Sequence, residues 1–553
     1  MTPITILFVF AFASLLFSLL YLQRKVSIRQ KELSAKAFFA KIEQETRMHL
    51  RRLYGSTAVL AVLVSGVLYA VPVFSFEESF SFLAGVLVMM AIVHSCFTFL
   101  SKFYSKFAGS TSYGFIGSFN SLFGTGNVLG VFIISSVLFF TTAHYTLIGP
   151  STPAIVSFVL GGLFFGMIFK TINPDIKSSL FLALEKVLEF GELAFSAVII
   201  SMIVSSLLLP GFIGAAVLPL LSVGAGIIAS LLGVGLMQMG ATTNIFKNIT
   251  VSMLGAILLF SIIIFPLIVW AMNENVQYSN IKLWISSFGA VALVGAMTLL
   301  QYFRKKYLSR PIVLLAFIPA GIYLSYLLAD LYGFSIFIVS LISVSPVIFS
   351  MFIFTHITQN FEFALETIDM PAEQKKIIYK LNSISESIIR GSKAYIWLVG
   401  TFIFIGFFLL YQNELDSQLI RDSFSLENPH VITGVFLALI AIFVAMRYIF
   451  SISPTNKESK PWAALDVELL RRSFIALGGF FLAPAILSIF GGAEMYSGFF
   501  IGIVVIATTL TVPGSLFDIK RKSNYSAITE RAEILSRLRI LGPASLLLIV
   551  FLI

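Results

Sequence analysis

The sequence is poor in cysteine and in charge. Its 553 residues include one cysteine, Cys96, which lies inside an apolar run. A single thiol excludes a disulfide framework and any metal site built on several cysteines. Only 12% of the residues are charged, whereas 58% are hydrophobic, far from the composition of soluble globular domains. We therefore expect a polytopic membrane protein.

Familiar catalytic motifs are absent as well. The sequence has no Walker phosphate loop, no Gly-x-Ser-x-Gly nucleophile elbow, no His-Glu-x-x-His zinc motif and no dinucleotide-binding fingerprint. The glycine-rich stretch from Gly109 to Gly126 lacks the lysine and the strand of a phosphate cradle. We expect that stretch to be a flexible connection, and we expect no metal and no cofactor.

Long apolar runs fill most of the chain. About 20 apolar residues in a helix cross the roughly 30 Å hydrocarbon core of a bilayer. We expect an all-α polytopic membrane protein of about 16 transmembrane helices in a compact two-ring bundle, with 333–355 in the inner group. The windows are 3–22, 56–75, 82–100, 126–147, 154–170, 190–210, 213–236, 251–272, 282–300, 311–330, 333–355, 394–412, 430–450, 473–491, 496–513 and 540–553.

Glycine and proline punctuate these windows. Glycines inside spans let helix backbones approach closely, whereas prolines kink or end helices. We expect the first behaviour of Gly161, Gly162, Gly224, Gly226, Gly233, Gly235, Gly289, Gly295, Gly478, Gly479 and Gly498, and the second of Pro210, Pro219, Pro266, Pro346 and Pro484.

The segments between the windows are too short for an independent soluble domain. Residues 1–553 are therefore expected to form a single transmembrane domain. The expected cytoplasmic loops are 23–55, 101–125, 171–189, 237–250, 301–310, 356–393, 451–472 and 514–539.

Basic residues collect in alternate loops. Nine Lys and Arg lie in 23–55, four in 301–310 and six in 514–539, whereas the opposite loops hold Lys282 and Arg421. The positive-inside rule then predicts a cell-membrane protein with both termini on the outer side. The net charge of +10 reflects this topology, so we expect membrane lipid and no nucleic acid as a partner.

One stretch, 331–395, carries a recognisable order of residues. It opens with Leu-Tyr-Gly at 331–333, continues as a membrane helix rich in small residues and reaches Pro371. In this order it resembles the membrane-integral pyrophosphatases, which couple pyrophosphate hydrolysis to proton or sodium transport. The resemblance implies the same orientation and external termini, and a homodimer.

The resemblance leaves four matching side chains. Aligned without gaps from Pro371, Asn360 and Glu366 coincide with residues of the family's site, and Lys393 and Asp518 match further on. The resemblance implies that these four are remnants of a hydrolytic site. Positions where the family has carboxylates or related polar ligands carry other residues, namely Phe352, Gln359, Arg531, Leu535 and Arg539, and Phe354 stands at the position of the family's tyrosine.

Ionisable residues inside the spans mark candidate ion paths, because charge in lipid is costly. Glu192 and His94 stand out. Glu192 is also placed to favour the helix dipole at the start of its helix, and His94 can be an interfacial residue, so both interpretations stay open.

Three functions remain in competition. The preferred one is a degenerate, non-hydrolytic homologue of the pyrophosphatases that acts as a membrane scaffold or partner subunit, in a homodimer or in a heterodimer with an intact homologue. The first alternative is a pyrophosphate-energised proton or sodium pump, which would use Mg²⁺. The second is a repurposed small-solute transporter or channel.

Overall fold

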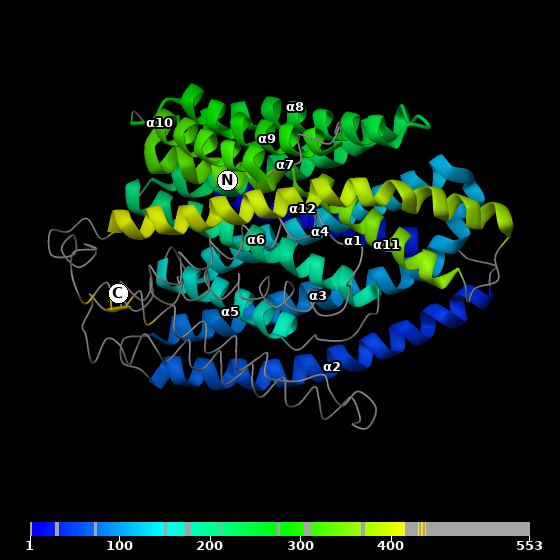
Figure 1. Ribbon diagram of the computed structural model, residues 1–553. Helices are drawn as coiled ribbons and strands as arrows, with labels where there is room; N and C mark the ends of the chain where they lie inside the picture. Colours follow the sequence, from blue (N-terminus) through cyan, green and yellow to red (C-terminus); the bar gives the residue numbers. More distant parts are fainter. Residues whose placement is uncertain are drawn as a thin grey trace. The chain divides into compact units, whose positions relative to one another are not determined.

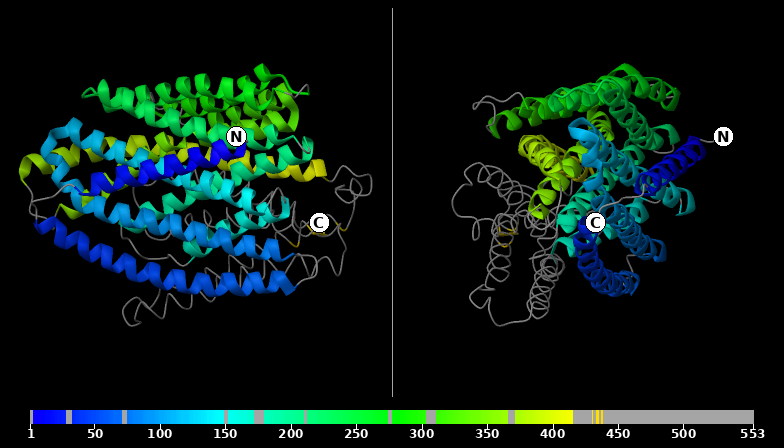
Figure 2. Two further views of the ribbon diagram at one scale, coloured as in Figure 1. Left: turned by 180° about the vertical axis from the view of Figure 1, so that it is seen from behind. Right: turned by 90° about the vertical axis from the view of Figure 1, so that its right-hand side faces the viewer.

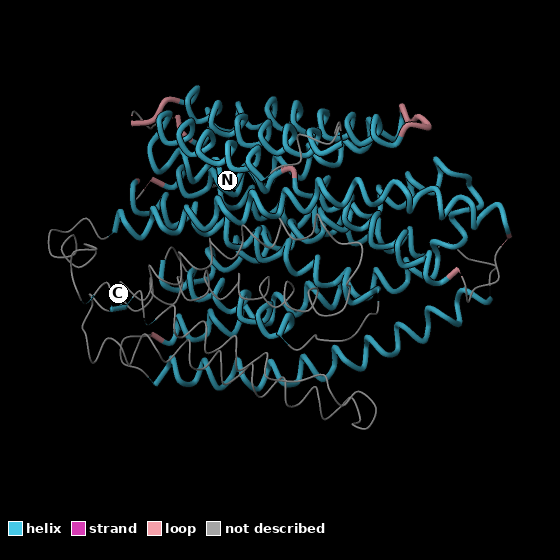
Figure 3. Tube along the Cα trace, in the orientation of Figure 1, coloured by secondary structure: helices cyan, strands magenta, loops and turns pink. Residues whose placement is uncertain are grey.

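Every secondary-structure element that the computed structural model describes is a helix (Figure 3). The described residues are 3–27, 33–70, 75–148, 152–171, 179–209, 212–273, 277–302, 311–365 and 371–414, with 430, 433, 434 and 437. The α-helices, labelled in Figure 1, are α1 (Pro3–Ser27), α2 (Leu33–Ala70), α3 (Phe76–Ser110), α4 (Gly114–Ile148), α5 (Thr152–Thr171), α6 (Ser179–Leu208), α7 (Ile213–Met239), α8 (Ile245–Ala271), α9 (Asn280–Tyr302), α10 (Pro311–Ser343), α11 (Ser345–Ala364) and α12 (Ala372–Glu414). A short 3-10 helix, η1 (Thr111–Tyr113), joins α3 to α4.

The chain is an all-α, multi-pass membrane protein. Within the described ranges, eight helical spans are long and apolar enough to cross a bilayer. They are Ile4–Gln23, Phe76–Tyr104, Gly114–Ile148, Ala183–Ser205, Ile213–Met239, Ile245–Ala271, Asn280–Thr298 and Ala320–Thr358.

Each of the twelve expected windows from 3–22 to 394–412 overlaps one or more of the helices α1 to α12. The windows 473–491, 496–513 and 540–553 lie outside the described residues, as does nearly all of 430–450. The total of about sixteen spans therefore stays a prediction.

The chain divides into two compact units. The first comprises Met1–Gly162 and Lys177–Gly406, and the second comprises Leu163–Ile176 and Phe407–Ile553. Of the second unit the structure describes 163–171 and 407–414, both helical, and four further residues. The description below concerns the first unit.

Helix continues through several segments that we expected to be loops. Helix α2 begins at Leu33 and α6 at Ser179. The flexible connection expected over 109–126 is wrong, because residues 114–126 belong to α4 and are mostly buried from Ser118 onward. A Cβ added at Gly126 would lie 2.8 Å from the Cα of Ser350 in α11. Gly126 therefore serves the packing of α4 against α11 and not flexibility.

Two helices occupy most of the expected cytoplasmic loop 356–393. Helix α11 ends at Ala364, and α12 begins after Pro371. Proline lacks the backbone N–H that an uninterrupted helix needs, and its ring fixes φ, so it suits the start of a new helix.

The stretch 331–355 is the most deeply buried part of the first unit, as expected for 333–355. Every residue from Leu331 to Thr355 is buried. The helix is interrupted at Val344, just before Pro346, which agrees with the expected break. A second discontinuity lies at Ala329 and Asp330, whose backbone angles are not helical. The segment 331–343 is thus a short helix bounded by two breaks.

Helices α1, α2 and α8 contribute to the apolar surface of the first unit, and α1 lies at its edge in the end-on view of Figure 2. They expose large aliphatic and aromatic side chains, as a face against lipid does. The exposed residues include Val9, Phe12, Leu20, Val59, Val62, Leu63, Leu258 and Ile262.

Candidate functional site

A charged face lies on the first half of α6. Lys186 Nζ bonds the Glu189 carboxylate at 2.8 and 2.9 Å, and both side chains are about one-fifth exposed. Glu192 follows three residues later, which places it on the same face of the helix, and it is 6% exposed. The ion pair of Lys186 with Glu189 and the buried carboxylate of Glu192 therefore lie on one face of α6.

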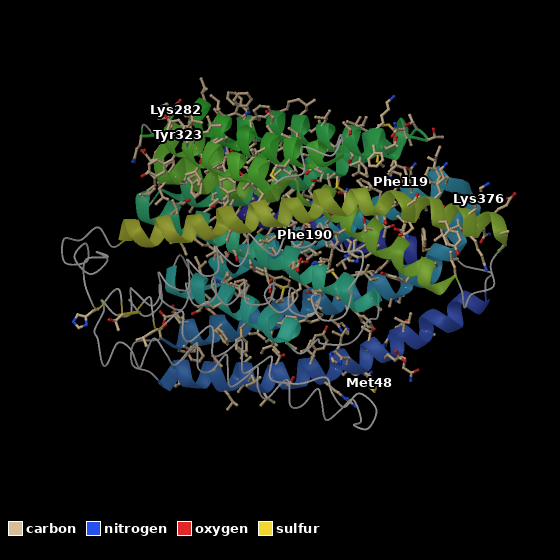
Figure 4. All side chains as sticks on the ribbon, in the orientation of Figure 1. Met48, Phe119, Phe190, Lys282, Tyr323 and Lys376 are labelled. Atoms are coloured by element: carbon tan, nitrogen blue, oxygen red, sulfur yellow. The ribbon has the colours of Figure 1, made fainter. Side chains whose placement is uncertain are left out.

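Aromatic rings cover this face from α11 and α12. The ring of Phe190, labelled in Figure 4, lies 4.8 Å from that of Phe349, 5.5 Å from that of Phe352 and 6.0 Å from that of Tyr395. Lys186 Nζ lies 6.0 Å from the centre of the Phe352 ring. We call Phe190, Phe349, Phe352 and Tyr395 the aromatic cluster.

His356 extends this cluster by one helical turn. Its ring stacks on Phe352 with centroids 6.4 Å apart. The cation of Lys186 faces the ring of Phe352 at a distance typical of a cation–π contact. The chemistry available here is therefore that of an ion pair held against aromatic rings.

Two buried tyrosines donate to backbone carbonyls, one at a proline inside a helix and one at the end of a helix. The Tyr332 hydroxyl donates to the carbonyl of Ala215 at 3.3 Å, and Pro219 lacks the N–H that would otherwise bond this carbonyl. The Tyr395 hydroxyl donates to the carbonyl of Leu341 at 3.1 Å, where α10 ends before Pro346. Such partners make breaks tolerable in lipid, where an unpaired carbonyl costs several kcal/mol.

The four expected remnants do not form a visible constellation. The backbone of Asn360 lies in α11 and that of Lys393 in α12, but their side chains are not described. Glu366 and Asp518 lie outside the described residues. The described residues contain no group of three or more His, Cys, Asp or Glu able to hold a metal ion.

The two expected ion-path residues lie in different surroundings. Glu192 is buried in the bundle, whereas His94 is exposed on α3, with its ring 5.9 Å from that of Tyr54 on α2. The exposure of His94 is compatible with the interfacial interpretation, which stays a prediction.

A buried histidine was missed by sequence reasoning. His144, near the end of α4, is 7% exposed, and its Nε2 lies 2.9 Å from the hydroxyl of Ser81. That hydroxyl donates to the carbonyl of Glu77, so His144 Nε2 is the donor in the first bond. His144 lies near the end of the apolar window 126–147. An ionisable residue inside such a window was the sequence signal that could have identified it.

The fold and these contacts define an all-α, multi-pass membrane protein with an aromatic interior. A scan of the chain against protein-family models gives no match, and a search of curated proteins gives none. The resemblance to membrane pyrophosphatases therefore depends on the aligned residues alone.

Proposed function

We propose that this protein is a non-hydrolytic relative of the membrane-integral pyrophosphatases that acts as a membrane scaffold or partner subunit. The aromatic cluster is the observation that carries the proposal. By the resemblance, Phe352 occupies the position of a metal-binding aspartate, and its ring packs against Phe190 and under Lys186.

The chemistry of pyrophosphate cleavage is the physical reason. Several magnesium ions must neutralise the charge that develops in the transition state, and magnesium takes oxygen ligands. A phenyl ring offers none. The Glu189 carboxylate already forms an ion pair with Lys186, so its negative charge is balanced without a magnesium ion. Asn360, Glu366, Lys393 and Asp518 are then structural remnants, and no cofactor is needed.

The same proposal includes the topology and the assembly. We propose about sixteen helices in two rings, both termini on the outer side of the cell membrane, and a homodimer or a heterodimer with an intact homologue. The burial difference between 331–355 and the outer helices supports an inner ring. Lys376, from the expected cytoplasmic segment 356–393, and Lys282, which we expect on the other side, lie at opposite ends of the bundle (Figure 4), which supports the proposed alternation of the loops.

Hydrolysis of pyrophosphate tests the enzymatic part. Purified protein in detergent or liposomes should release no phosphate from magnesium pyrophosphate above a protein-free blank, because several carboxylate ligands are replaced at once. Magnesium-dependent release that disappears in Glu366→Gln or Asp518→Asn would reject the proposal and favour the proton or sodium pump.

Mass measurement tests the assembly. Native mass spectrometry should detect a dimer, either of this chain alone or with an intact pyrophosphatase added. A spectrum that shows only monomer under both conditions would contradict the proposed scaffold or partner-subunit function.

A small-solute transporter is the second candidate, favoured by buried polar groups between α4 and α7. Asn127 donates to the carbonyl of Ser230 at 3.3 Å, but Asn127 Oδ1, Ser222 Oγ and Ser230 Oγ are buried without a hydrogen bond among the described groups. A polar solute could use these atoms. Liposomes that swell in small uncharged solutes, and stop doing so with Asn127→Leu, would favour this candidate over the scaffold.

A further inference from the structure

Helix α2 is much longer than a bilayer crossing requires. Its 38 residues correspond to about 57 Å at 1.5 Å per residue, against roughly 30 Å of hydrocarbon. The stretch from Arg52 to Ala70 accounts for about 27 Å of it. The expected window 56–75 puts the last part of α2 in the hydrocarbon, and this places the residues before Arg52 in the head-group region and beyond.

The exposed face of α2 changes its chemistry at one point. Between Gly55 and Tyr69 the described exposed positions are all glycine, valine, leucine or tyrosine. Val59, Val62 and Leu63 are 62%, 58% and 60% exposed. Arg51 and Arg52 directly precede this apolar face, and both are exposed. The guanidinium groups of Arg51 and Arg52 therefore lie at the expected boundary between the hydrocarbon and the head-group region.

The neighbouring α3 presents a polar residue near this level. The rings of Tyr54 on α2 and His94 on α3 are 5.9 Å apart, and Tyr54 lies less than one turn from Arg51. His94 is exposed, and the exposed positions before it, Leu87 and Ala91, are apolar. The exposed faces of α2 and α3 thus change from apolar to polar at the same level along the helix axes.

Arg51 and Arg52 differ from a nearby arginine in their contacts. Arg47 pairs with Glu43 at 2.5 Å and lies over the ring of Phe97. Neither Arg51 nor Arg52 forms an ion pair or hydrogen bond with the described part of the chain. Their charges are available to a ligand outside the protein.

We propose that Arg51 and Arg52, with His94 beside them, bind the phosphate of an acidic phospholipid whose acyl chains lie along Val59, Val62 and Leu63. The apolar face selects a lipid over a free anion, because it gives the chains a surface continuous with the head-group contacts. Guanidinium groups suit a phosphate because their N–H donors match its oxygens. This inference requires membrane insertion alone and is independent of the proposed function.

Native mass spectrometry with phosphatidylglycerol and phosphatidylcholine tests the site. The wild-type chain should retain phosphatidylglycerol, and Arg51→Gln with Arg52→Gln should lower its affinity on the order of tenfold or more, from two basic residues near the surface. Arg47→Gln with Glu43→Gln is the matched control, and its affinity should stay within about twofold. Equal retention by the wild type and the double variant would overturn the site. So would equal retention of phosphatidylcholine.

A second measurement covers the case in which the Gln variant does not fold. Arg51→Lys with Arg52→Lys keeps both charges and should keep most of the binding. A photoreactive phosphatidylglycerol bound to the wild-type chain should label residues 51–63 of α2 and the surroundings of His94, and inorganic phosphate in excess should not prevent labelling. Labelling confined to other helices, or competition by phosphate at equal concentration, would exclude a lipid site here.

Discussion

The inner helix and the outer helices of the first unit use opposite kinds of side chains. The most apolar window of Ala320–Thr358 is wholly buried, whereas 17% of the corresponding window in α1 is buried. The buried stretch carries five serines, Ser335, Ser340, Ser343, Ser345 and Ser350. The exposed face of α1 carries valine, leucine and phenylalanine.

This difference follows from the solvent. Lipid tails are as apolar as leucine, so burying leucine drives little association between helices in a membrane. Close packing and hydrogen bonds supply the stability instead, and small residues allow both. The inner helix meets α7 in this way, because Ser343 donates to the carbonyl of Ser222 at 2.9 Å. Matched substitutions inside and outside should therefore have unequal effects.

The largest effect is expected at the aromatic cluster. Phe190→Ala should lower the free energy of unfolding by on the order of 3 kcal/mol, because it leaves a cavity among Phe349, Phe352 and Tyr395. Phe17→Ala on α1, where the ring is 50% exposed, should change it by less than about 1 kcal/mol. Thermal unfolding of both variants in one detergent measures the difference. Equal losses would contradict the division into inner and outer helices.

A smaller effect is expected from a single methyl group. Gly126→Ala places a Cβ 2.8 Å from the Cα of Ser350, so α4 and α11 must separate, at about 2 kcal/mol. Gly55→Ala on α2 meets nothing within 4 Å and should be neutral or stabilising by up to about 1 kcal/mol. Protease resistance in detergent ranks the two. A Gly126 variant as resistant as the Gly55 variant would refute close packing there.

The loss of one hydroxyl comes next. Tyr395→Phe leaves the carbonyl of Leu341 without its donor and should cost about 1 to 2 kcal/mol. Tyr323→Phe, at a site 70% exposed and labelled in Figure 4, should cost almost nothing. Hydrogen exchange at the α10–α11 break should increase in the first variant alone, and unchanged exchange would deny Tyr395 its role.

Hydropathy and proline were sufficient to predict part of this organisation. A run of apolar residues over 333–355 predicts a buried helix without knowledge of its neighbours, and Pro346 predicts the interruption, because both are properties of the local chain. The fold class followed for the same reason.

The role of the glycines depended on neighbours that the sequence does not name. Gly126 packs against a residue more than two hundred positions away, and a glycine-rich stretch is locally compatible with either a loop or a tight helix contact. The aromatic cluster could not be predicted from the sequence either, because Phe190 and Phe352 resemble other apolar residues of the spans until the packing of α6 against α11 is known.

The smallest expected effect, and a stabilising one, lies at the discontinuity of α10 at Ala329 and Asp330. Asp330 has φ 50° and ψ −147°, a region that glycine adopts easily and other residues do not. Asp330→Gly should relieve this strain, but glycine also gains freedom in the unfolded chain. We expect a net stabilisation of about 0.5 kcal/mol, measured by thermal unfolding at neutral pH, with Asp330→Ala as the control that keeps the strain.

The same substitution should alter the response to alkali. Burial, and secondly the charge of Asp330, raise the pKa of Tyr278 in the loop before α9. A phenol with a raised folded-state pKa adds stability that is complete below its unfolded pKa and is lost as the pH rises through the folded value. Without the Asp330 carboxylate that folded value falls, so the alkaline loss of stability should be smaller in Asp330→Gly and should be complete at lower pH. Ultraviolet titration of wild type, Asp330→Gly and Tyr278→Phe separates this phenol from the others. A titration unchanged by Asp330→Gly would show that burial alone sets the pKa of Tyr278.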